Sequence, residues 1–458
     1  MAYYYRKRRQ SHEGLFFLIL VAVAITLLII LGFTIKGRYF GGDGPEGGGL
    51  ADASGGTGTQ ATSQTPGGTD AGSPATDALG TGDGGDDPGD GGDGDTEGSG
   101  WDGGYATTKI NKPQFDGLKV KAIYLTGSTV ANHLRFTGFI DMVNETELNA
   151  VVIDLRESTG VEYRSRLESV VEYGDRVVKY DIEEVVGRLN ENGIYVIGRL
   201  VCFQSILAGV KGEWAIKDED EVTVWKDVSG AYWLNPYNRD VWEYLLDIAE
   251  EAVLLGVDEI QFDYVRFPTP SVTKVLYYGK DVPSKEEAIE GFLLRAKERI
   301  TETYGIPVSA DVYGIIIESD LDAGLVGQKL EYIGRDGIIL CPMIYPSHYA
   351  NEKSNGYGQA VNGVLFKAPD LEPYKLIYNV LLKMRSRSLS IDGFNSTIRP
   401  YLQAFTASYL AEGYWQAYTP SVIREQIQAV YDAGYEEWIL WDHNNNYKRD
   451  TFMPPVES

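Results

Sequence analysis

Eight short apolar runs, each followed by a stretch with helical periodicity, constrain the fold of this chain most strongly. The runs lie at residues 120–126, 150–156, 194–203, 257–268, 306–313, 336–345, 398–405 and 437–442. Apolar residues in them do not alternate with polar ones, a pattern typical of strands buried on both faces of a parallel sheet. Such strands need helices packed against them, and the intervening stretches can supply these helices.

The stretches between the runs carry the signals that begin and end helices. Residues 238–255 place apolar side chains on one face and end before Gly256. A capping-box sequence at residues 284–287 precedes a second predicted helix at 288–304. Similar signals predict helices at 181–192 and from 419 to about 434.

Eight strand–helix units in some 340 residues predict an α/β fold, a closed (β/α)8 TIM barrel. The alternative is an open doubly wound sheet, which normally carries a glycine-rich first turn if it binds a dinucleotide. After the first run this chain has Thr126-Gly127-Ser128-Thr129, which lacks the three-glycine spacing. The barrel is therefore favoured.

An uncharged apolar run near the N-terminus predicts a membrane anchor. Residues 15–35 are long enough to span a bilayer as a helix, and four basic residues at 6–9 precede them. We therefore expect a cytoplasmic basic tail at 1–14, a transmembrane signal anchor at 15–35 and an extracellular remainder. A cleaved signal peptide is the alternative, but Gly37-Arg38-Tyr39-Phe40 is a poor cleavage site.

Residues 36–110 predict a disordered linker between this anchor and a folded domain at 111–458. The segment is rich in Gly, Ser, Thr and Asp, and residues 41–100 contain no Lys or Arg and almost nothing to bury. A flexible coil of this length spans roughly 40–50 Å. It either gives the domain reach through a cell envelope or is a simple spacer.

Charge and composition limit the classes of partner and cofactor that this chain can bind. The net charge of -25 argues against nucleic acid as a partner. Cys202 and Cys341 each lie in an apolar run and predict buried free thiols rather than a disulfide framework. The histidines outside the tail, His133, His348 and His443, lack the paired spacing of ligands, so no metal or other cofactor is predicted.

The fourth run carries a carboxylate that is costly to bury. Asp263 lies among apolar and aromatic residues, and Pro268 stops the strand a few residues later. Ligands bind at the carboxyl ends of barrel strands, so Asp263 is a candidate functional residue. Strand alternation predicts Gln261, Asp263 and Val265 on one side, with Tyr264 and Arg266 on the other.

Other strand ends add acids, aromatic rings and amides to the same rim. This set suits glycoside hydrolysis, in which one carboxylate attacks or activates water, another protonates the leaving oxygen, and aromatic faces hold sugar rings. Asp263 and Asp311, the predicted catalytic pair, are on neighbouring strands, which is compatible with the carboxyl separation of about 5–5.5 Å in retaining enzymes. Strand stagger is equally compatible with a larger separation, so the stereochemical outcome stays open. The predicted substrate-binding residues are Asp154, Arg199, Tyr345, Gln403, Trp441 and Asp442.

Four of these residues have structural alternatives. Asp154 and Arg199 are equally consistent with an ion pair across adjacent strands. Asp311 is also consistent with a cap on the turn that follows its strand. Asp442 precedes His443 and three asparagines, a composition that favours an Asx-rich loop over catalysis.

Residues 258–268, with the sequence DEIQFDYVRFP, closely resemble the signature of a bacterial family of glycosyl hydrolase domains of uncharacterised function. The resemblance extends along residues 119–448. Its other motifs are VID at 152–154, YVIGR at 195–199, EWAI at 213–216, WLNPY at 233–237, ADVYG at 310–314, PMIYPSHY at 342–349, RPYLQAF at 399–405 and WILW at 438–441.

This resemblance implies a TIM barrel distantly similar to α-amylase-type barrels. Those barrels place a nucleophilic Asp after strand four and an acid after strand five, and the corresponding residues here are Asp263 and Asp311. The chain departs from the family at Ser205 and Ala404, where members tend to have acids.

The leading hypothesis is a membrane-anchored extracellular glycoside hydrolase that acts on a cell-envelope or extracellular polysaccharide. Asp263 would be the nucleophile or electrostatic stabiliser, Asp311 the acid/base, and Arg199 the residue that orients a carboxylate. The departures at Ser205 and Ala404 motivate an alternative, an inactive barrel that binds envelope polysaccharide or a protein partner. A third reading is a structural spacer in an envelope complex.

Overall fold

A computed structural model describes residues 112–270 and 273–455, all of which lie in one compact unit, Gly98–Ser458. The predicted tail at 1–14, anchor at 15–35 and linker at 36–110 lie outside these residues. Within the described ranges, no helix combines the length and the apolar character that crossing a bilayer requires.

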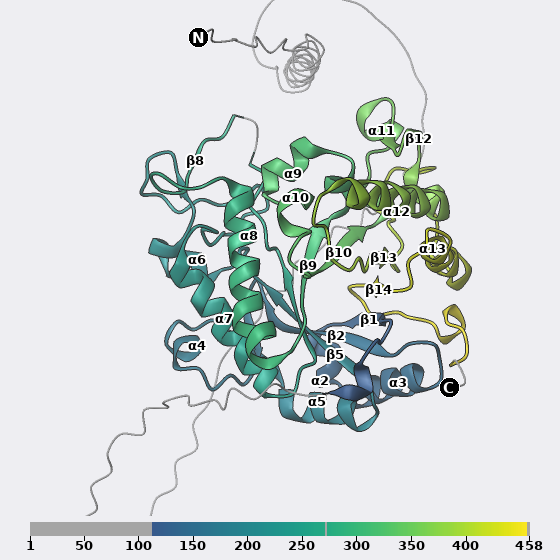
Figure 1. Cartoon of the computed structure of the whole chain (residues 1–458), viewed down its shortest axis with the longest axis horizontal. Coiled ribbons are helices and arrows are strands. Elements are labelled where there is room, and N and C mark those ends of the chain that lie inside the picture. The colour runs from purple at the N-terminus through teal and green to yellow at the C-terminus, as the bar shows by residue number, and fades with distance from the viewer. Residues whose placement is uncertain (1–111, 271–272, 456–458) are drawn as a thin grey trace, which may run out of the picture. The chain divides into compact units, whose positions relative to one another are not determined.

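Eight parallel strands form a closed barrel (Figure 1). Each strand pairs with the next one along the chain, and β1 pairs with both β2 and β14, which closes the ring. The predicted (β/α)8 barrel is therefore confirmed. The strands are β1 (Lys121–Leu125), β2 (Ala150–Glu157), β5 (Tyr195–Val201), β7 (Glu259–Asp263), β9 (Val308–Tyr313), β10 (Ile339–Ile344), β13 (Tyr401–Gln403) and β14 (Trp438–Trp441).

Helices cover the outside of the ring (Figure 1). The longer ones are α3 (His133–Asn144), α5 (Ile182–Glu191), α7 (Arg239–Leu254), α8 (Lys285–Ala296), α12 (Pro373–Ser390) and α13 (Pro420–Asp432). The predicted capping box of Ser284 and Glu287 is present at α8, and at α7 the Asn238 side chain accepts from two backbone N–H groups. The helix α8 continues directly as a π-helix, η3 (Lys297–Glu302).

Short elements fill the connections. The barrel strand β2 is extended outward by β3 (Gly160–Tyr163), which runs antiparallel to it, and by β4 (Arg176–Tyr180). The remaining helices and strands are α2 (Gly127–Ala131), α4 (Glu168–Glu172), α6 (Leu207–Val210), β6 (Lys217–Asp218), β8 (Leu276–Tyr277), α9 (Asp320–Val326), α10 (Leu330–Ile333), α11 (Glu352–Asn355), β11 (Gln359–Val361) and β12 (Val364–Phe366). Short 3-10 turns are η1 (Pro113–Phe115), η2 (Gly212–Trp214), η4 (Gly314–Ile317), η5 (Pro346–His348), η6 (Pro369–Leu371) and η7 (Arg449–Thr451).

Two apolar clusters stabilise the domain. The larger one lies between the strands and the helices and includes fully buried aromatic residues such as Trp242, Phe262 and Phe292. A smaller cluster inside the barrel includes Tyr124 and Tyr401. Cys202 and Cys341 are free and buried, as predicted, and burial raises the pKa of both thiols. The interior is therefore filled up to the level of the carboxyl ends of the strands.

Candidate active site

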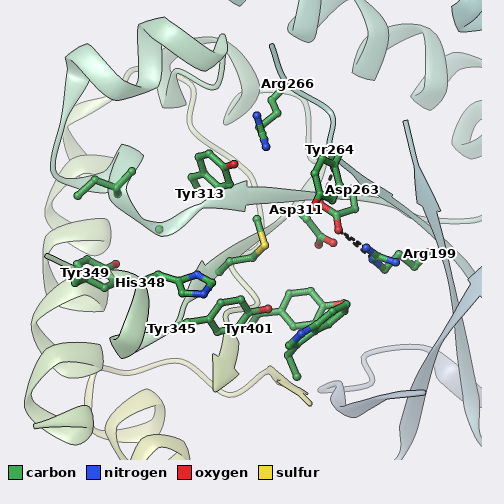
Figure 2. A pocket seen from close by; sticks show the side chains of 14 residues that line it. Arg199, Asp263, Tyr264, Arg266, Asp311, Tyr313, Tyr345, His348, Tyr349 and Tyr401 are labelled. Atoms are coloured by element: carbon green, nitrogen blue, oxygen red, sulfur yellow. Dashed lines mark hydrogen bonds and ion pairs between the residues drawn. The ribbon is translucent and has the colours of Figure 1, made fainter. Parts of the chain in front are cut away.

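A cavity of about 450 Å³ opens at the carboxyl ends of the barrel strands (Figure 2). Five of the eight predicted site residues line it: Arg199, Asp263, Asp311, Tyr345 and Trp441. They come from five different strands or the segments directly after them. Convergence of strand ends is the general way in which a barrel of this type builds a site.

Asp263 is the last residue of β7 and is only 6% exposed. Its Oδ2 accepts hydrogen bonds from Arg199 Nε at 3.0 Å and from Arg199 Nη2 at 2.7 Å. The backbone N–H of Tyr264 donates to its Oδ1 at 2.6 Å. These donors are those that stabilise a negatively charged carboxylate, two of them on a cation.

Arg199 on β5 contacts two further carboxylates. Its Nη1 donates to Asp154 Oδ1 at 2.6 Å and to Glu157 Oε1 at 2.5 Å. The predicted structural ion pair with Asp154 is thus present, and the same guanidinium also holds Asp263. The face of Arg199 lies 5.1 Å from the ring centroid of Trp441, which stacks on Tyr124 at 3.8 Å. Arg199 is fixed from several sides and can hold Asp263 in one orientation.

Asp154 lies behind this pair and does not line the cavity. It is buried, and the Tyr124 hydroxyl donates to its Oδ2 at 2.6 Å. Burial raises the pKa of Asp154 to about 6, against the opposing effect of Arg199. Burial also acts to raise the pKa of Glu157, but Arg199 outweighs it and the pKa is lowered. Asp154 therefore positions Arg199 rather than facing a ligand.

Asp311 on β9 is the second carboxyl in the cavity and is 2% exposed. Its Oδ1 is buried and has no hydrogen-bond partner among the described residues. Burial, and then repulsion from Asp263, raise the pKa of Asp311 well above its usual range, although Arg199 opposes this. This shift favours the protonated form of the Asp311 carboxyl. Gln328 donates to its backbone carbonyl, and the predicted turn cap is not among the contacts of its side chain.

The two carboxyls lie side by side because their strands are neighbours. In the β7–β9 ladder Phe262 is opposite Ala310, and Asp263 and Asp311 are the next residues on each strand. Adjacent strands are about 4.8 Å apart. Figure 2 shows Asp311 beside Asp263, with Arg199 on the opposite side of Asp263. One site thus contains a carboxylate paired with Arg199 and a second carboxyl whose pKa is raised, the arrangement that acid–base catalysis uses.

Aromatic side chains form much of the cavity wall. Tyr345, Tyr401 and Trp441 contribute rings, and His348 packs edge-on against Tyr345 at 5.1 Å between ring centroids. Burial lowers the pKa of His348, which favours its neutral form. These rings offer apolar faces of the kind on which sugar rings stack.

The alternation predicted beyond Asp263 is wrong. The strand β7 ends at Asp263, and Tyr264 adopts a left-handed conformation with φ +51°. The chain leaves the pleat there, so Tyr264 and Arg266 line the cavity together with Asp263, and Val265 is fully buried. A tyrosine rarely adopts this conformation, and no sequence pattern signals it.

Gln403 and Asp442 do not line the cavity. The side chain of Gln403 is fully buried, accepts from the backbone N–H of Ser347 at 3.0 Å and donates to Asp370 at 3.0 Å. Asp442 accepts from the backbone N–H groups of Asn444 at 2.9 Å and Asn446 at 2.8 Å. Its contacts are those of the Asx-rich loop that was the structural alternative.

Sequence reasoning missed several lining residues. His348, Tyr349 and Tyr401 line the cavity, as do Gly314 and Ile315. All of them lie within motifs of the family resemblance or directly beside one. The motifs marked these regions of the chain, but they did not show that these residues line the cavity. Within residues 112–270 and 273–455 no group of three or more His, Cys, Asp and Glu side chains is arranged to hold a metal ion.

Solved structures with a similar fold include glycoside hydrolase domains. The glycoside hydrolase domain of PgaB (BpsB) from Bordetella bronchiseptica has a TM-score of 0.52 at 12% identity, with 74% of this chain and 100% of that chain covered. This likeness supports the fold alone. An alpha-galactosidase from Thermus thermophilus has a TM-score of 0.42 at 13% identity, over 71% of this chain and 61% of that one.

A closer sequence relative is a hypothetical protein from Ruminiclostridium thermocellum ATCC 27405. It is 41% identical over 42% of this chain and 97% of its own, with a TM-score of 0.39. A search of curated proteins gave no match. Residues 122–447, well over half of the chain, match the family described as "Putative glycosyl hydrolase domain". The chain belongs to this family of glycosyl hydrolase domains.

Proposed function

We propose that this protein is a glycoside hydrolase that cleaves a polysaccharide by a two-carboxylate mechanism. One observation carries the proposal: a carboxylate held by Arg199, Asp263, lies in the same cavity as Asp311, a buried carboxyl whose pKa is raised by burial and by repulsion from Asp263. Glycoside hydrolysis needs a base or nucleophile and an acid flanking the scissile bond.

In this mechanism Asp311 donates its proton to the leaving oxygen. Positive charge develops on the sugar as the bond breaks, and Asp263 either attacks the anomeric carbon or stabilises that charge. Asp311, now a carboxylate, then takes a proton from the incoming water. Arg199 pairs with the Asp263 carboxylate and holds it aimed at the anomeric carbon, while Tyr345 and Trp441 pack against sugar rings.

The sequence also motivates a proposal for where in the cell this protein is located. We propose that residues 15–35 anchor the protein in the cell membrane, with residues 1–14 in the cytoplasm and the barrel outside, so that its substrate is an envelope or extracellular polysaccharide. A fusion of residues 1–40 to alkaline phosphatase tests the orientation. An exported anchor gives phosphatase activity in the membrane fraction, and activity released into the medium would indicate cleavage instead.

The proposed chemistry is tested on a panel of polysaccharides with mass-spectrometric detection of products. We expect the unsubstituted protein to release oligosaccharides from at least one glycan. Asp311→Asn removes the proton that the leaving oxygen needs, so the rate should fall by about 10²- to 10⁴-fold. Absence of product from every glycan, or an unchanged rate in the variant, would contradict the proposal.

The departures that motivated an inactive binding barrel lie outside the cavity wall. Ser205 is buried and its Oγ accepts from Arg156 Nη2 at 2.6 Å. The backbone N–H of Ala404 donates to the Trp441 carbonyl at 2.9 Å, and its side chain does not line the cavity. Neither departure removes a carboxyl from the cavity, so the pair of Asp263 and Asp311 remains complete.

A further inference from the structure

Arg266 is a second guanidinium in the cavity, and its surroundings differ from those of Arg199. It is 8% exposed and lies on the loop that leaves β7, three residues after Asp263. The guanidinium lies among three aromatic rings, with centroids at 4.8 Å for Trp233, 5.2 Å for Tyr264 and 4.5 Å for Tyr313. In Figure 2 it points toward Tyr313 and Tyr264, into the cavity.

No carboxylate of the described residues lies within ion-pair distance of Arg266, whereas Arg199 contacts three. Among the described residues, the hydrogen bond of the Arg266 guanidinium is to the carbonyl oxygen of Phe267, at 3.0 Å. A guanidinium has five N–H donors and a permanent positive charge. Most of its hydrogen-bonding capacity is therefore unused.

A buried charge without a counter-ion is costly, and cation–π contacts offset only part of this cost. The other charged groups of the cavity do not relieve it. Asp263 is held by Arg199, and burial and repulsion from Asp263 raise the pKa of Asp311, which disfavours a negative charge there. The aromatic rings fix the position of the Arg266 guanidinium while leaving its donors open to the cavity.

We propose that Arg266 binds an anionic substituent of the substrate, so that the preferred glycan carries a carboxylate, as in a uronic acid, on a sugar close to the scissile bond. The planar fork of a guanidinium matches a carboxylate through two parallel hydrogen bonds. A sulfate ester presents similar anionic oxygens. This inference rests on the proposed function, because the bound glycan is a substrate only if the protein hydrolyses it. Binding of the acidic sugar itself does not require turnover.

The test is a calorimetric titration with matched acidic and neutral oligosaccharides: oligogalacturonate and oligoglucuronate, their methyl esters, and a sulfated neutral oligosaccharide. Methyl esterification removes the charge and keeps the sugar. We expect at least one uronate to bind about tenfold or more tightly than its ester, as charge-assisted hydrogen bonds do. If the sulfated oligosaccharide alone shows the preference, the anion site stands and the uronate assignment is wrong.

Variants assign the preference to Arg266. Arg266→Gln should abolish the difference between acid and ester, and Arg266→Lys should retain part of it, because a point charge replaces the fork. Arg239→Gln is the matched control: this guanidinium lies 3.5 Å from the Trp242 ring centroid, but it is exposed and outside the cavity. We expect no change in that variant.

Equal binding of acid and ester by the unsubstituted protein would overturn the inference without any variant, as would a preference that survives in Arg266→Gln. Product analysis of the same samples separates the two proposals. Acid-selective binding without hydrolysis leaves the inference intact and contradicts the proposed function. Hydrolysis of acid and ester at equal rates, without acid-selective binding, supports the proposed function and contradicts the inference.

Discussion

At the residue scale, Arg199 determines how the candidate site is charged. Its guanidinium is 3% exposed and contacts Asp154, Glu157 and Asp263 at 2.5–2.7 Å. Without it, three carboxylates would face one another in a largely buried region. A buried ion pair contributes little compared with apolar packing, but removal of one partner leaves charges uncompensated.

Arg199→Met should therefore lower the free energy of unfolding by about 3–5 kcal/mol. The matched control is Arg295→Met, since Arg295 also bridges two carboxylates, Glu243 and Glu298, but is 39% exposed. That change should cost about 1 kcal/mol or less. Urea unfolding at neutral pH measures both, and similar losses in the two variants would contradict this view of Arg199.

Glu162 makes stability depend on pH. It is fully buried on β3, one carboxylate oxygen pairs with Lys179, and the other has no partner in the part of the chain that the structure describes. Burial, and then repulsion from Asp154, raise the pKa of Glu162 from 4.5 to about 7. Between these values the folded state binds more protons than the unfolded state, so this group stabilises the fold at low pH and its contribution is lost as pH rises through about 7.

Glu162→Gln should flatten the pH dependence of unfolding. We expect the free energy of unfolding of the unsubstituted protein to fall between pH 5 and 8 with a contribution from Glu162 of at most about 1.4 kcal/mol per pH unit. Asp154, whose pKa is raised to about 6, adds a fall of the same sign that the variant retains. Glu183→Gln, at an exposed surface pair with Arg166, should keep the full pH slope. An identical slope in Glu162→Gln would show the assignment to be wrong.

At the element scale, local signals in the sequence predicted where the helices begin. Ser284 accepts from the backbone N–H of Glu287, and the Glu287 carboxylate accepts from Ser284 in return. The path of the chain after the carboxyl end of β7 was predicted less well, because the left-handed conformation of Tyr264 depends on tertiary contacts. Asp263 was found from the cost of its burial, whereas Arg266 was placed on the wrong side of the strand.

Ser284→Ala should lower the free energy of unfolding by about 1 kcal/mol, because the backbone N–H of Glu287 loses its side-chain acceptor in the first turn of α8. Thr419→Ala offers a matched comparison at α13, where the N-cap hydroxyl makes no hydrogen bond to the backbone of the helix. We expect a smaller loss there, measured by chemical unfolding of both variants. Equal losses would mean that the capping box at α8 contributes nothing beyond the intrinsic preference of the residue.

At the scale of the whole molecule, the barrel could be predicted because its strands are buried on both faces and its helices are amphipathic. Both patterns are local, and the strand pattern occurs eight times around the ring. The site was predicted in part: residues on the strands themselves, such as Asp263 and Asp311, follow from the topology. Residues on loops, such as His348, do not, because the path of a loop is set by contacts that are distant in sequence.

The most direct test of the two-carboxylate site is the rate of reducing-end release by Asp263→Asn on the most reactive glycan. The variant retains the shape of the side chain and removes the charge that faces the anomeric carbon, so we expect hydrolysis to fall below detection with little change in melting temperature. Asp442→Asn, another buried Asp but outside the cavity, should hydrolyse at nearly the parental rate once its stability is accounted for. Release at the parental rate by Asp263→Asn would contradict the site described for this protein.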